Sequence, residues 1–337
     1  MAGVIFSKLS GKNDSTFKAV EGVLTEIIKD VDTGKTKDDE VLEAIFNVKK
    51  SSKFGERAGG LTEFGNFDLV GEGQPAPNDE IEEGFGKLIE HRAALKGFVV
   101  TKEMVDDNRL DDARIAAKNF VRSYKRSKLQ YATNFLVAEG ATFSYGNSTG
   151  LDRTTGDGVG LFSTSHPGKK TGVANQSNVF TNALGTDIQT LNRLANIGRN
   201  FKNESGNILG YTFDTIVIPG NTPQLEETAN RIIQTQLVVG SNNNDINTQK
   251  GKWRLIVNHR WEAANGAAPY LLMSSEANEE LRGLMFFNRT PLDVMNEVDI
   301  KTRNFIWTGY GRFSVGAFNW RAVIMGGAQA GTTLAAL

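Results

Sequence analysis

The histidines of this chain are the side chains best suited to acid–base chemistry, and only one of them has nucleophiles close by. His166 follows Ser163 and Ser165 in the segment LFSTSHP, residues 161–167. A histidine that accepts the proton of a serine hydroxyl is typical of a covalent hydrolase. The alternative is a loop histidine hydrogen-bonded to the backbone, and the sequence favours this alternative.

Metal, cofactor and phosphate sites are not predicted. The three histidines lie far apart, none is in an HExxH or HxH motif, and the chain has no cysteine. The glycine-rich segments 55–60 and 326–327 lack the strand–helix context and the Lys-Ser/Thr pair of a phosphate-binding loop. The acidic run 79–83 lacks the ligand spacing of a calcium loop. The sequence therefore predicts no enzyme and no cofactor.

The most informative feature is a charge inversion between two stretches. Residues 59–86 contain no Lys or Arg and hold the acids Glu63, Asp68, Glu72, Asp79, Glu80, Glu82 and Glu83. Residues 113–138 contain no acid and hold the bases Arg114, Lys118, Arg122, Lys125, Arg126 and Lys128. Exposed pairs within one chain contribute only about 0–1 kcal/mol each, whereas complementary patches on separate copies set register and specificity. The pattern therefore favours an assembly protein over an enzyme.

The composition is that of a globular protein. The 337 residues are 39% hydrophobic and 23% charged, so a sizeable core can form, and the length suggests two compact lobes. A formal net charge of −1 argues against a dedicated nucleic-acid-binding domain. Because no apolar run approaches the ~18 residues of a membrane span, we expect a protein that is made and used in solution.

The first half of the chain is predicted to consist of helices around an extended loop. Two short helices are expected within residues 1–50, the second capped by Thr36. Residues 53–86, rich in Gly and Phe, predict an extended loop, with an acidic disordered linker as the alternative. Residues 97–100 predict a strand, and a long helix should then run from Asp107 or Asn108 to about Glu139, with Gly140 as its stop. Its apolar face is formed by Phe120, Tyr124, Tyr131 and Phe135.

The second half mixes helices and strands. Helices are predicted at 185–202 and after Thr222, with Pro223 at the first helical position. Strands are predicted at 214–218, 253–257, 270–273 and in a series from Val298 to Met325, with a polar loop at 241–248. Because the two element types do not alternate regularly, the fold class is α+β.

This order of elements resembles the major capsid (head) protein of tailed bacteriophages, in particular the Mu-type major head subunit branch with a Hong Kong 97-like fold. The most specific matching segments are KGFVVTKEMVDD, residues 96–107, and LFSTSHP, residues 161–167. The resemblance implies an N-terminal arm (1–52), an extended loop (53–90) and a peripheral domain (91–204) with a spine helix at 108–139. It also implies an axial domain (205–285) and C-terminal strands (286–337) that return to the peripheral domain.

The resemblance also implies a function and partners. Pentamers and hexamers would build an icosahedral virion shell in the host cytoplasm around double-stranded DNA held without sequence specificity. Scaffold or protease, portal and decoration proteins would be partners, and a membrane would not. Some family members join subunits through a lysine of the extended loop, but residues 58–86 hold no lysine, so that bond is not predicted. The alternatives are an encapsulin-like nanocompartment and a soluble hydrolase using Ser163 or Ser165 with His166.

The charge inversion locates the expected contact between subunits. We expect the acidic loop of one copy to lie on the basic helix region of the next. The candidate contact residues are Phe64, Phe67, Asp68 and Glu72 in the loop and Arg114, Lys118, Arg122 and Lys125 in the helix.

Overall fold

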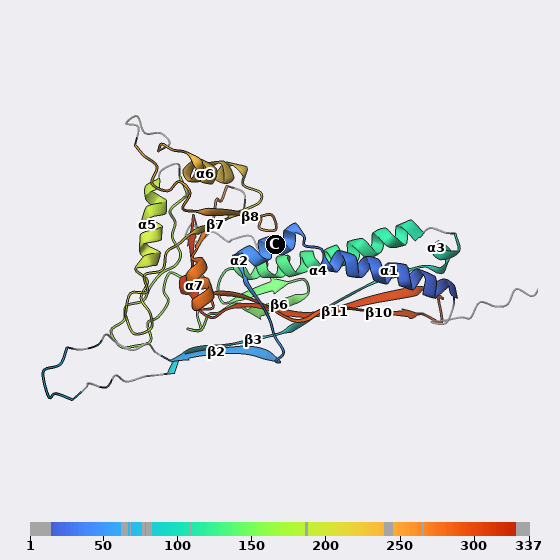
Figure 1. Cartoon of the computed structure of the whole chain (residues 1–337), viewed down its shortest axis with the longest axis horizontal. Coiled ribbons are helices and arrows are strands. Elements are labelled where there is room, and N and C mark those ends of the chain that lie inside the picture. Colours follow the sequence, from blue (N-terminus) through green and yellow to red (C-terminus); the bar gives the residue numbers. More distant parts are fainter. Residues whose placement is uncertain are drawn as a thin grey trace, which may run out of the picture.

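Two four-stranded sheets organise the chain into a long lobe and an upright lobe (Figure 1). The computed structural model describes residues 15–61, 67, 69–75, 78, 83–107, 110–185, 188–238, 245–264 and 266–327. The long sheet has the order β1 (Asn47–Lys50), β10 (Leu284–Val298), β11 (Phe305–Ala317) and β4 (Arg92–Val100). The second sheet has the order β12 (Val323–Gly326), β9 (Tyr270–Met273), β7 (Thr215–Pro219) and β8 (Arg254–Asn258). Two hairpins, β2 (Gly55–Leu61) with β3 (Glu83–Glu90) and β5 (Thr142–Tyr145) with β6 (Ser148–Asp152), complete the strands.

The long helix and the helices that follow residues 185 and 222 lie close to where the sequence predicts them, whereas the first helix is longer than expected and the helix Ser275–Glu280 was not predicted. The helices are α1 (Ser15–Thr33), α2 (Lys37–Ile45), α3 (Lys102–Asp106), α4 (Leu110–Val137), α5 (Ile188–Arg199), α6 (Pro223–Gln234), α7 (Ser275–Glu280) and the 3-10 turn η1 (Trp320–Ala322). Thr36 caps α2 in a reciprocal capping box with Asp39, and Gly140 after α4 has a φ of +70°. The mixture of helices and strands agrees with the predicted α+β class. None of the described helices combines the length and the apolar character needed to cross a membrane.

The long helix α4 lies on the long sheet through its aromatic face (Figure 1). Phe120, Tyr131 and Phe135 are buried, as their spacing predicts. Two glycines of β11 allow this close approach: a Cβ at Gly309 would lie 2.4 Å from the Phe120 ring, and one at Gly311 would lie 2.6 Å from the Tyr124 hydroxyl. With 28 residues, α4 is roughly 42 Å long at 1.5 Å per residue, so it supports most of the lobe.

Residues 21–52, within the segment predicted as an N-terminal arm, pack against this lobe. Leu24 and Ile28 of α1 are buried in one cluster with Val121 of α4 and Trp307 of β11. Strand β1 pairs in parallel with β10. The apolar stripes of α1 and α2 therefore find their partner surface in their own chain, mainly on α4.

The C-terminal end of α4 is held by a buried arginine. Arg153 is 0% exposed and donates hydrogen bonds to the carbonyl oxygens of Phe135 (2.5 Å), Leu136 (3.0 Å) and Gly140 (3.0 Å). The last carbonyls of a helix have no partner within the helix, so the guanidinium satisfies groups that would otherwise be buried without one. Burial lowers the pKa of Arg153 to about 9, which still leaves it charged at neutral pH.

The upright lobe takes its last strand from the C-terminal region. Strands β10 and β11 pair with each other in the long sheet. Strand β12 instead pairs antiparallel with β9, because residues 318–322 lead the chain back across to the second sheet. Asp38 of α2 adds a link between the lobes by accepting hydrogen bonds from Arg260 (3.0 Å) and His259 (2.7 Å), which follow β8.

Candidate functional site

The basic face of α4, defined as Arg114, Lys118, Arg122 and Arg126, points to solvent. All four residues are exposed and recur every four positions along the helix. Arg114 pairs with Asp111 at 3.0 Å on the surface. Lys118 and Arg122 form no ion pair with the part of the chain that the structure describes. Within the described part of the chain, Lys118 and Arg122 are therefore exposed cations without an ion-pair partner on this face.

Lys125, the fourth base predicted as a contact residue, does not lie on this face. Its side chain is 4% exposed, and its ammonium group pairs with Asp39 at 3.2 Å and donates to the Gly34 carbonyl. Helices α1 and α2 pack over this side of α4 and enclose it. Because Lys125 already has partners inside its own chain, we remove it from the predicted contact residues.

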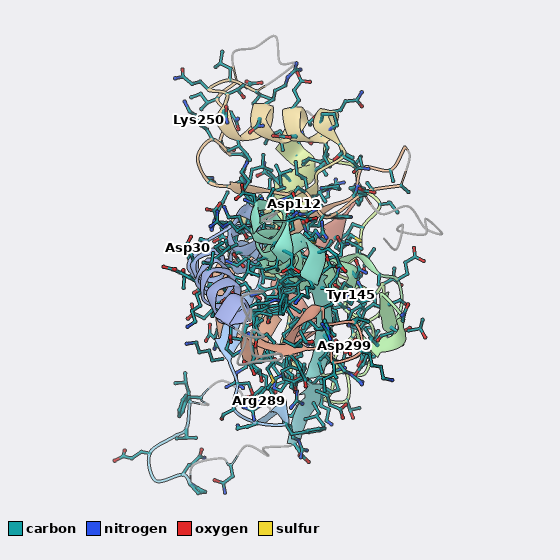
Figure 2. All side chains as sticks on the ribbon, turned by 90° about the vertical axis from the view of Figure 1, so that its right-hand side faces the viewer. Asp30, Asp112, Tyr145, Lys250, Arg289 and Asp299 are labelled. Carbon is teal, nitrogen blue, oxygen red and sulfur yellow. The ribbon has the colours of Figure 1, made fainter. Side chains whose placement is uncertain are left out.

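The extended loop predicted at 53–90 has a regular base and an exposed outer part. Strands β2 and β3 pair antiparallel, so the base is a regular hairpin where the sequence predicted a loop. Beyond it, Phe67 and Glu72 are exposed, and the segment stands away from the body (Figures 1 and 2). Phe64 and Asp68, the other two predicted contact residues, lie outside the described residues. The hairpin is tied to the long lobe by Lys87, which pairs with Asp152 of β6.

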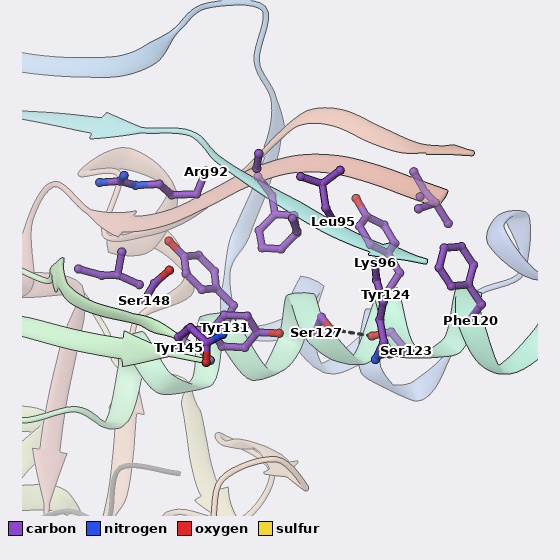
Figure 3. A pocket seen from close by; sticks show the side chains of 18 residues that line it. Arg92, Leu95, Lys96, Phe120, Ser123, Tyr124, Ser127, Tyr131, Tyr145 and Ser148 are labelled. Atoms are coloured by element: carbon purple, nitrogen blue, oxygen red, sulfur yellow. Dashed lines mark hydrogen bonds between the residues drawn. The ribbon is translucent and has the colours of Figure 1, made fainter. Parts of the chain in front are cut away.

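A cavity of about 380 Å³ lies between α4 and β4, on the aromatic side of α4 (Figure 3). Its apolar lining includes Leu95, Phe120, Leu292 and Phe313, and the turn of the β5–β6 hairpin closes one side. The charged residues lining it are two cations, Arg92 and Lys96, and none is an acid. Burial raises the pKa of Tyr124 and Tyr131 to about 12, so these lining phenols are neutral at physiological pH. The sequence could not predict this cavity, because its walls come from five separate segments of the chain.

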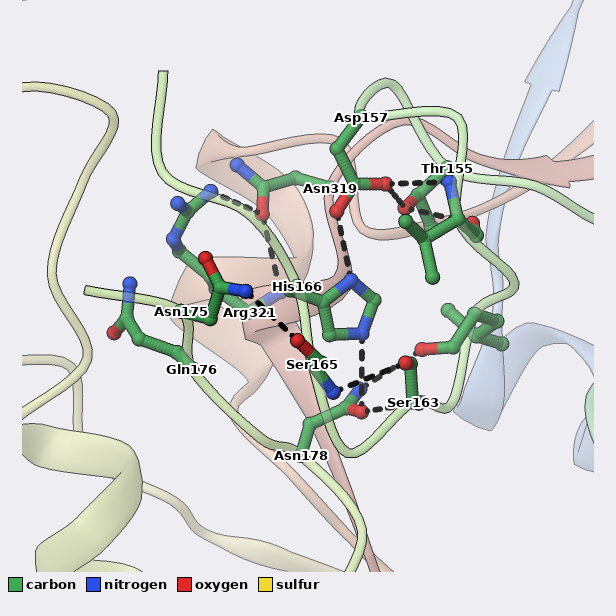
Figure 4. Close-up of polar contacts among 12 residues, drawn as sticks. Thr155, Asp157, Ser163, Ser165, His166, Asn175, Gln176, Asn178, Asn319 and Arg321 are labelled. Atoms are coloured by element: carbon green, nitrogen blue, oxygen red, sulfur yellow. Dashed lines mark hydrogen bonds and ion pairs between the residues drawn. The ribbon is translucent and has the colours of Figure 1, made fainter. Parts of the chain in front are cut away.

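His166 has a structural role in the loop that follows β6 (Figure 4). It is 0% exposed, stacks on Trp320 with 4.2 Å between ring centroids, and places Nδ1 2.7 Å from Asp157 and Nε2 3.2 Å from the Asn178 side-chain oxygen. Asn178 donates from its amide nitrogen to the Leu161 and Val323 carbonyls, which fixes the orientation of that amide. Both ring nitrogens are therefore committed to acceptors.

This geometry does not support the hydrolase alternative. The hydroxyl of Ser163 accepts a hydrogen bond from the Ser165 backbone, and the hydroxyl of Ser165 accepts one from Asn175. Neither hydroxyl is paired with the His166 ring, which has no free nitrogen to act as a base. His166 is a loop histidine, as the sequence favours, but its ring is hydrogen-bonded to the side chains of Asp157 and Asn178 and not to the backbone. The backbone of His166 pairs with that of Gln176. Among the described residues, no group of three His, Asp or Glu side chains could hold a metal ion.

His91 lies at the base of the extended hairpin in a second polar cluster. Its Nε2 is 2.9 Å from the Ser51 hydroxyl and its Nδ1 is 2.9 Å from the Ser314 hydroxyl. Ser51 donates to Glu56 at 2.6 Å, so it must accept its hydrogen bond from His91. A neutral ring with the proton on Nε2 satisfies this arrangement, and it joins β2, β11 and the segment after β1.

This cluster predicts a loss of stability in acid. Burial lowers the pKa of His91 below its ordinary 6.5. The negative charge of Glu56 raises that pKa, and the positive charges of Arg312 and Arg289 lower it further. The unfolded chain therefore binds this proton first as the pH falls below about 6.5, which favours unfolding. We expect His91→Gln to reduce the fall in melting temperature of the unassembled chain between pH 8 and pH 5. Equal falls in the two proteins would contradict this role.

Comparisons with known proteins give one consistent result. The family model described as "Phage capsid protein" matches residues 96–326. No curated protein matches the chain. Among solved structures, the fold is similar to the "Capsid of native GTA particle computed with C5 symmetry" (11% identity, TM-score 0.56, covering 87% of this chain and 91% of that one). It is also similar to a structure from Mycobacterium phage Patience, with 11% identity and a TM-score of 0.54, covering 95% of this chain and 90% of that one. The capsid of Myoviridae phage XM1 is similar as well, with 13% identity and a TM-score of 0.51, covering 82% of this chain and 88% of that one.

Proposed function

Because this chain belongs to the phage capsid protein family and is a capsid shell protein, we propose that it is the major head subunit of a tailed phage. In this proposal pentamers and hexamers form an icosahedral shell around double-stranded DNA. The encapsulin-like alternative is not favoured, since the matching family is one of phage capsid proteins. The single observation that carries the proposal is the match over residues 96–326, which include α4 and most of both sheets.

We propose further that the chain has the Hong Kong 97-like fold of the Mu-type branch, with the long lobe as its peripheral domain and the upright lobe as its axial domain. A long helix lying on a sheet, a projecting hairpin and a second α/β lobe support this assignment. Assembly takes place in the host cytoplasm with a separate scaffold or protease, and portal and decoration proteins complete the head. The DNA contacts the shell without sequence specificity, which agrees with the net charge of −1.

Contact between neighbouring subunits is proposed to use opposite charge. The outer part of the extended segment carries Glu72 exposed, and the basic face of α4 carries Lys118 and Arg122 without ion-pair partners in the described part of the chain. Each exposed pair contributes only about 0–1 kcal/mol, but a shell repeats each pair at every equivalent interface. Opposite potentials also steer subunits into register and reject wrong orientations.

The test of this function is whether the chain forms particles. We expect the protein, expressed with its scaffold, to sediment as megadalton particles that appear as closed shells by negative-stain microscopy. A single species of 36.8 kDa under the same conditions would contradict the proposal.

A further inference from the structure

Another cavity, of about 490 Å³, lies between α4, strand β10 and the turn that joins α1 to α2. The end of strand β1 completes its wall. Its charged lining consists of five cations and three acids, namely Lys35, Lys50, Lys125, Lys128 and Arg289 with Asp32, Asp39 and Glu43. The described residues therefore give this cavity an excess of two positive charges.

Two ion pairs within the lining neutralise part of this charge. Lys125 pairs with Asp39 at 3.2 Å, and Lys35 pairs with Glu43 at 2.8 Å. Of the lining acids this leaves Asp32, which forms no ion pair with the described part of the chain. The lining cations that likewise remain without an ion pair in the described part of the chain are Lys50, Lys128 and Arg289.

Arg289 has a buried donor that no acceptor among the described residues satisfies. Its Nη1 donates to the Ser51 carbonyl at 3.5 Å, whereas its Nε–H is buried without a hydrogen-bond partner in this part of the chain. Buried donors are almost always paired with protein, ordered water or an ion. The guanidinium therefore holds an unused donor in the wall of a positively charged cavity.

Lys128 is a second cation of this wall whose charge is poorly balanced. Its ammonium group lies 5.1 Å from the centroid of the Tyr124 ring. Burial lowers the pKa of Lys128, although the negative charges of Asp39 and Asp32 raise it. An anion in the cavity would favour the charged form of this lysine.

The arrangement of these donors fits a phosphate group. Lys128 lies on α4, Arg289 on β10 and Lys50 at the end of β1, so they line the cavity from three elements. A tetrahedral anion has oxygens that point in several directions, whereas the two oxygens of a carboxylate lie in one plane. Arginine binds phosphate through parallel N–H donors, and lysine binds it as a point charge. A phosphoryl group carries a charge of about −1.5 to −2 at neutral pH, which balances the excess of two cations.

We propose that this cavity is a phosphate site, in which Arg289 and Lys128 hold the phosphate group and the exposed Lys50 lies at the edge. A water molecule occupies about 30 Å³ in the liquid, so the cavity has room for the group and several waters. Bound phosphate would connect α4, β10 and the turn after α1, and would stabilise the packing of the N-terminal helices on the long lobe. Inorganic phosphate and the backbone of nucleic acid carry the same group, and the experiment separates these two sources.

Thermal unfolding of the unassembled chain tests the site, with inorganic phosphate as the probe. A ligand that binds only the folded chain stabilises it with the logarithm of its concentration. We expect the melting temperature to rise by about 2–3 °C for each tenfold increase in phosphate above its Kd, at an ionic strength held constant with sodium chloride. Phosphate also stabilises folded proteins in general because it is excluded from their surfaces, so variants must separate the two effects.

Lys128→Met and Arg289→Met should each weaken phosphate binding by about tenfold or more, because each removes a hydrogen bond to a charged group. Lys250→Met is the matched control, since it removes an exposed cation of the upright lobe far from Arg289 (Figure 2) and should bind as the unaltered chain does. Arg289→Lys keeps the charge but loses the Nε donor, and it should also weaken binding if the methionine variants do not fold. An equal effect of phosphate on all these variants would overturn the inference.

A second arm identifies the source of the phosphate group. Its probe is a short single-stranded DNA oligonucleotide without terminal phosphates. Stabilisation by inorganic phosphate alone, reduced in Arg289→Met, would identify a free ion, and stabilisation by the oligonucleotide alone, reduced in the same variant, would identify the nucleic-acid backbone. Stabilisation by neither probe would overturn the inference. Shell formation is not measured in either arm, so the outcome is independent of the proposed function.

Discussion

Lys118→Glu combined with Arg122→Glu is expected to abolish shell assembly while leaving the chain folded. Both side chains are exposed on α4 and form no ion pair with the described part of their own chain, so reversal breaks no ion pair there. At each interface it converts an attraction of about 0–1 kcal/mol per pair into a repulsion of similar size, and a shell repeats that change at every equivalent interface. Sedimentation measures assembly, and circular dichroism checks the fold.

Two further variants separate this effect from a change in net charge. Lys250→Glu with Lys252→Glu shifts the net charge equally, but on the upright lobe, and should assemble. Adding Asp68→Lys and Glu72→Lys to the α4 double variant should restore part of the shell yield, because it restores opposite charge across the proposed contact. Normal shells from the α4 double variant, or equal failure of the control, would argue against the charge pairing.

Local features of the fold could be predicted because neighbouring residues determine them. The Thr36 capping box, Pro223 at the start of α6 and Gly140 after α4 each depend on a few consecutive residues. The separation of aromatic and basic faces on α4 follows from the helical period alone. For the same reason the exposure of Lys118 and Arg122 could be predicted before any tertiary contact was known.

Features that depend on distant segments could not be predicted in this way. Lys125 follows the same run of bases, but its surroundings are set by α2 and the turn before it, more than 80 positions away in the chain. The glycine-rich strands β2 and β3 carry little apolar alternation, so the hairpin base was missed and only a loop was predicted. The contacts of His166 with Asp157 and Asn178 could not be predicted, because irregular loops bring these residues together. Such loops leave no periodic pattern in the sequence.

Replacing Arg153 by Met is expected to destabilise the unassembled chain by about 3–5 kcal/mol, a large part of the 5–15 kcal/mol typical of a domain. Methionine fills similar apolar space but donates no hydrogen bond, so the carbonyls of Phe135, Leu136 and Gly140 lose their guanidinium partner. Each buried acceptor left unsatisfied costs about 1–3 kcal/mol. Urea unfolding followed by tryptophan fluorescence measures the change in midpoint.

The matched control lies at the other end of the same helix. Arg114→Met removes a base of the same type that is exposed and paired with Asp111 at the surface, so its cost should stay below about 1 kcal/mol. The loss of stability in Arg153→Lys should lie between those of Arg153→Met and Arg114→Met. An ammonium group keeps the charge, but it cannot reach three carbonyls in the planar geometry of a guanidinium. Similar unfolding midpoints for Arg153→Met and Arg114→Met would contradict this role of Arg153. Water would then replace the guanidinium at the end of α4, and the hydrogen bonds of Arg153 would add little to the stability of the helix that carries the basic face.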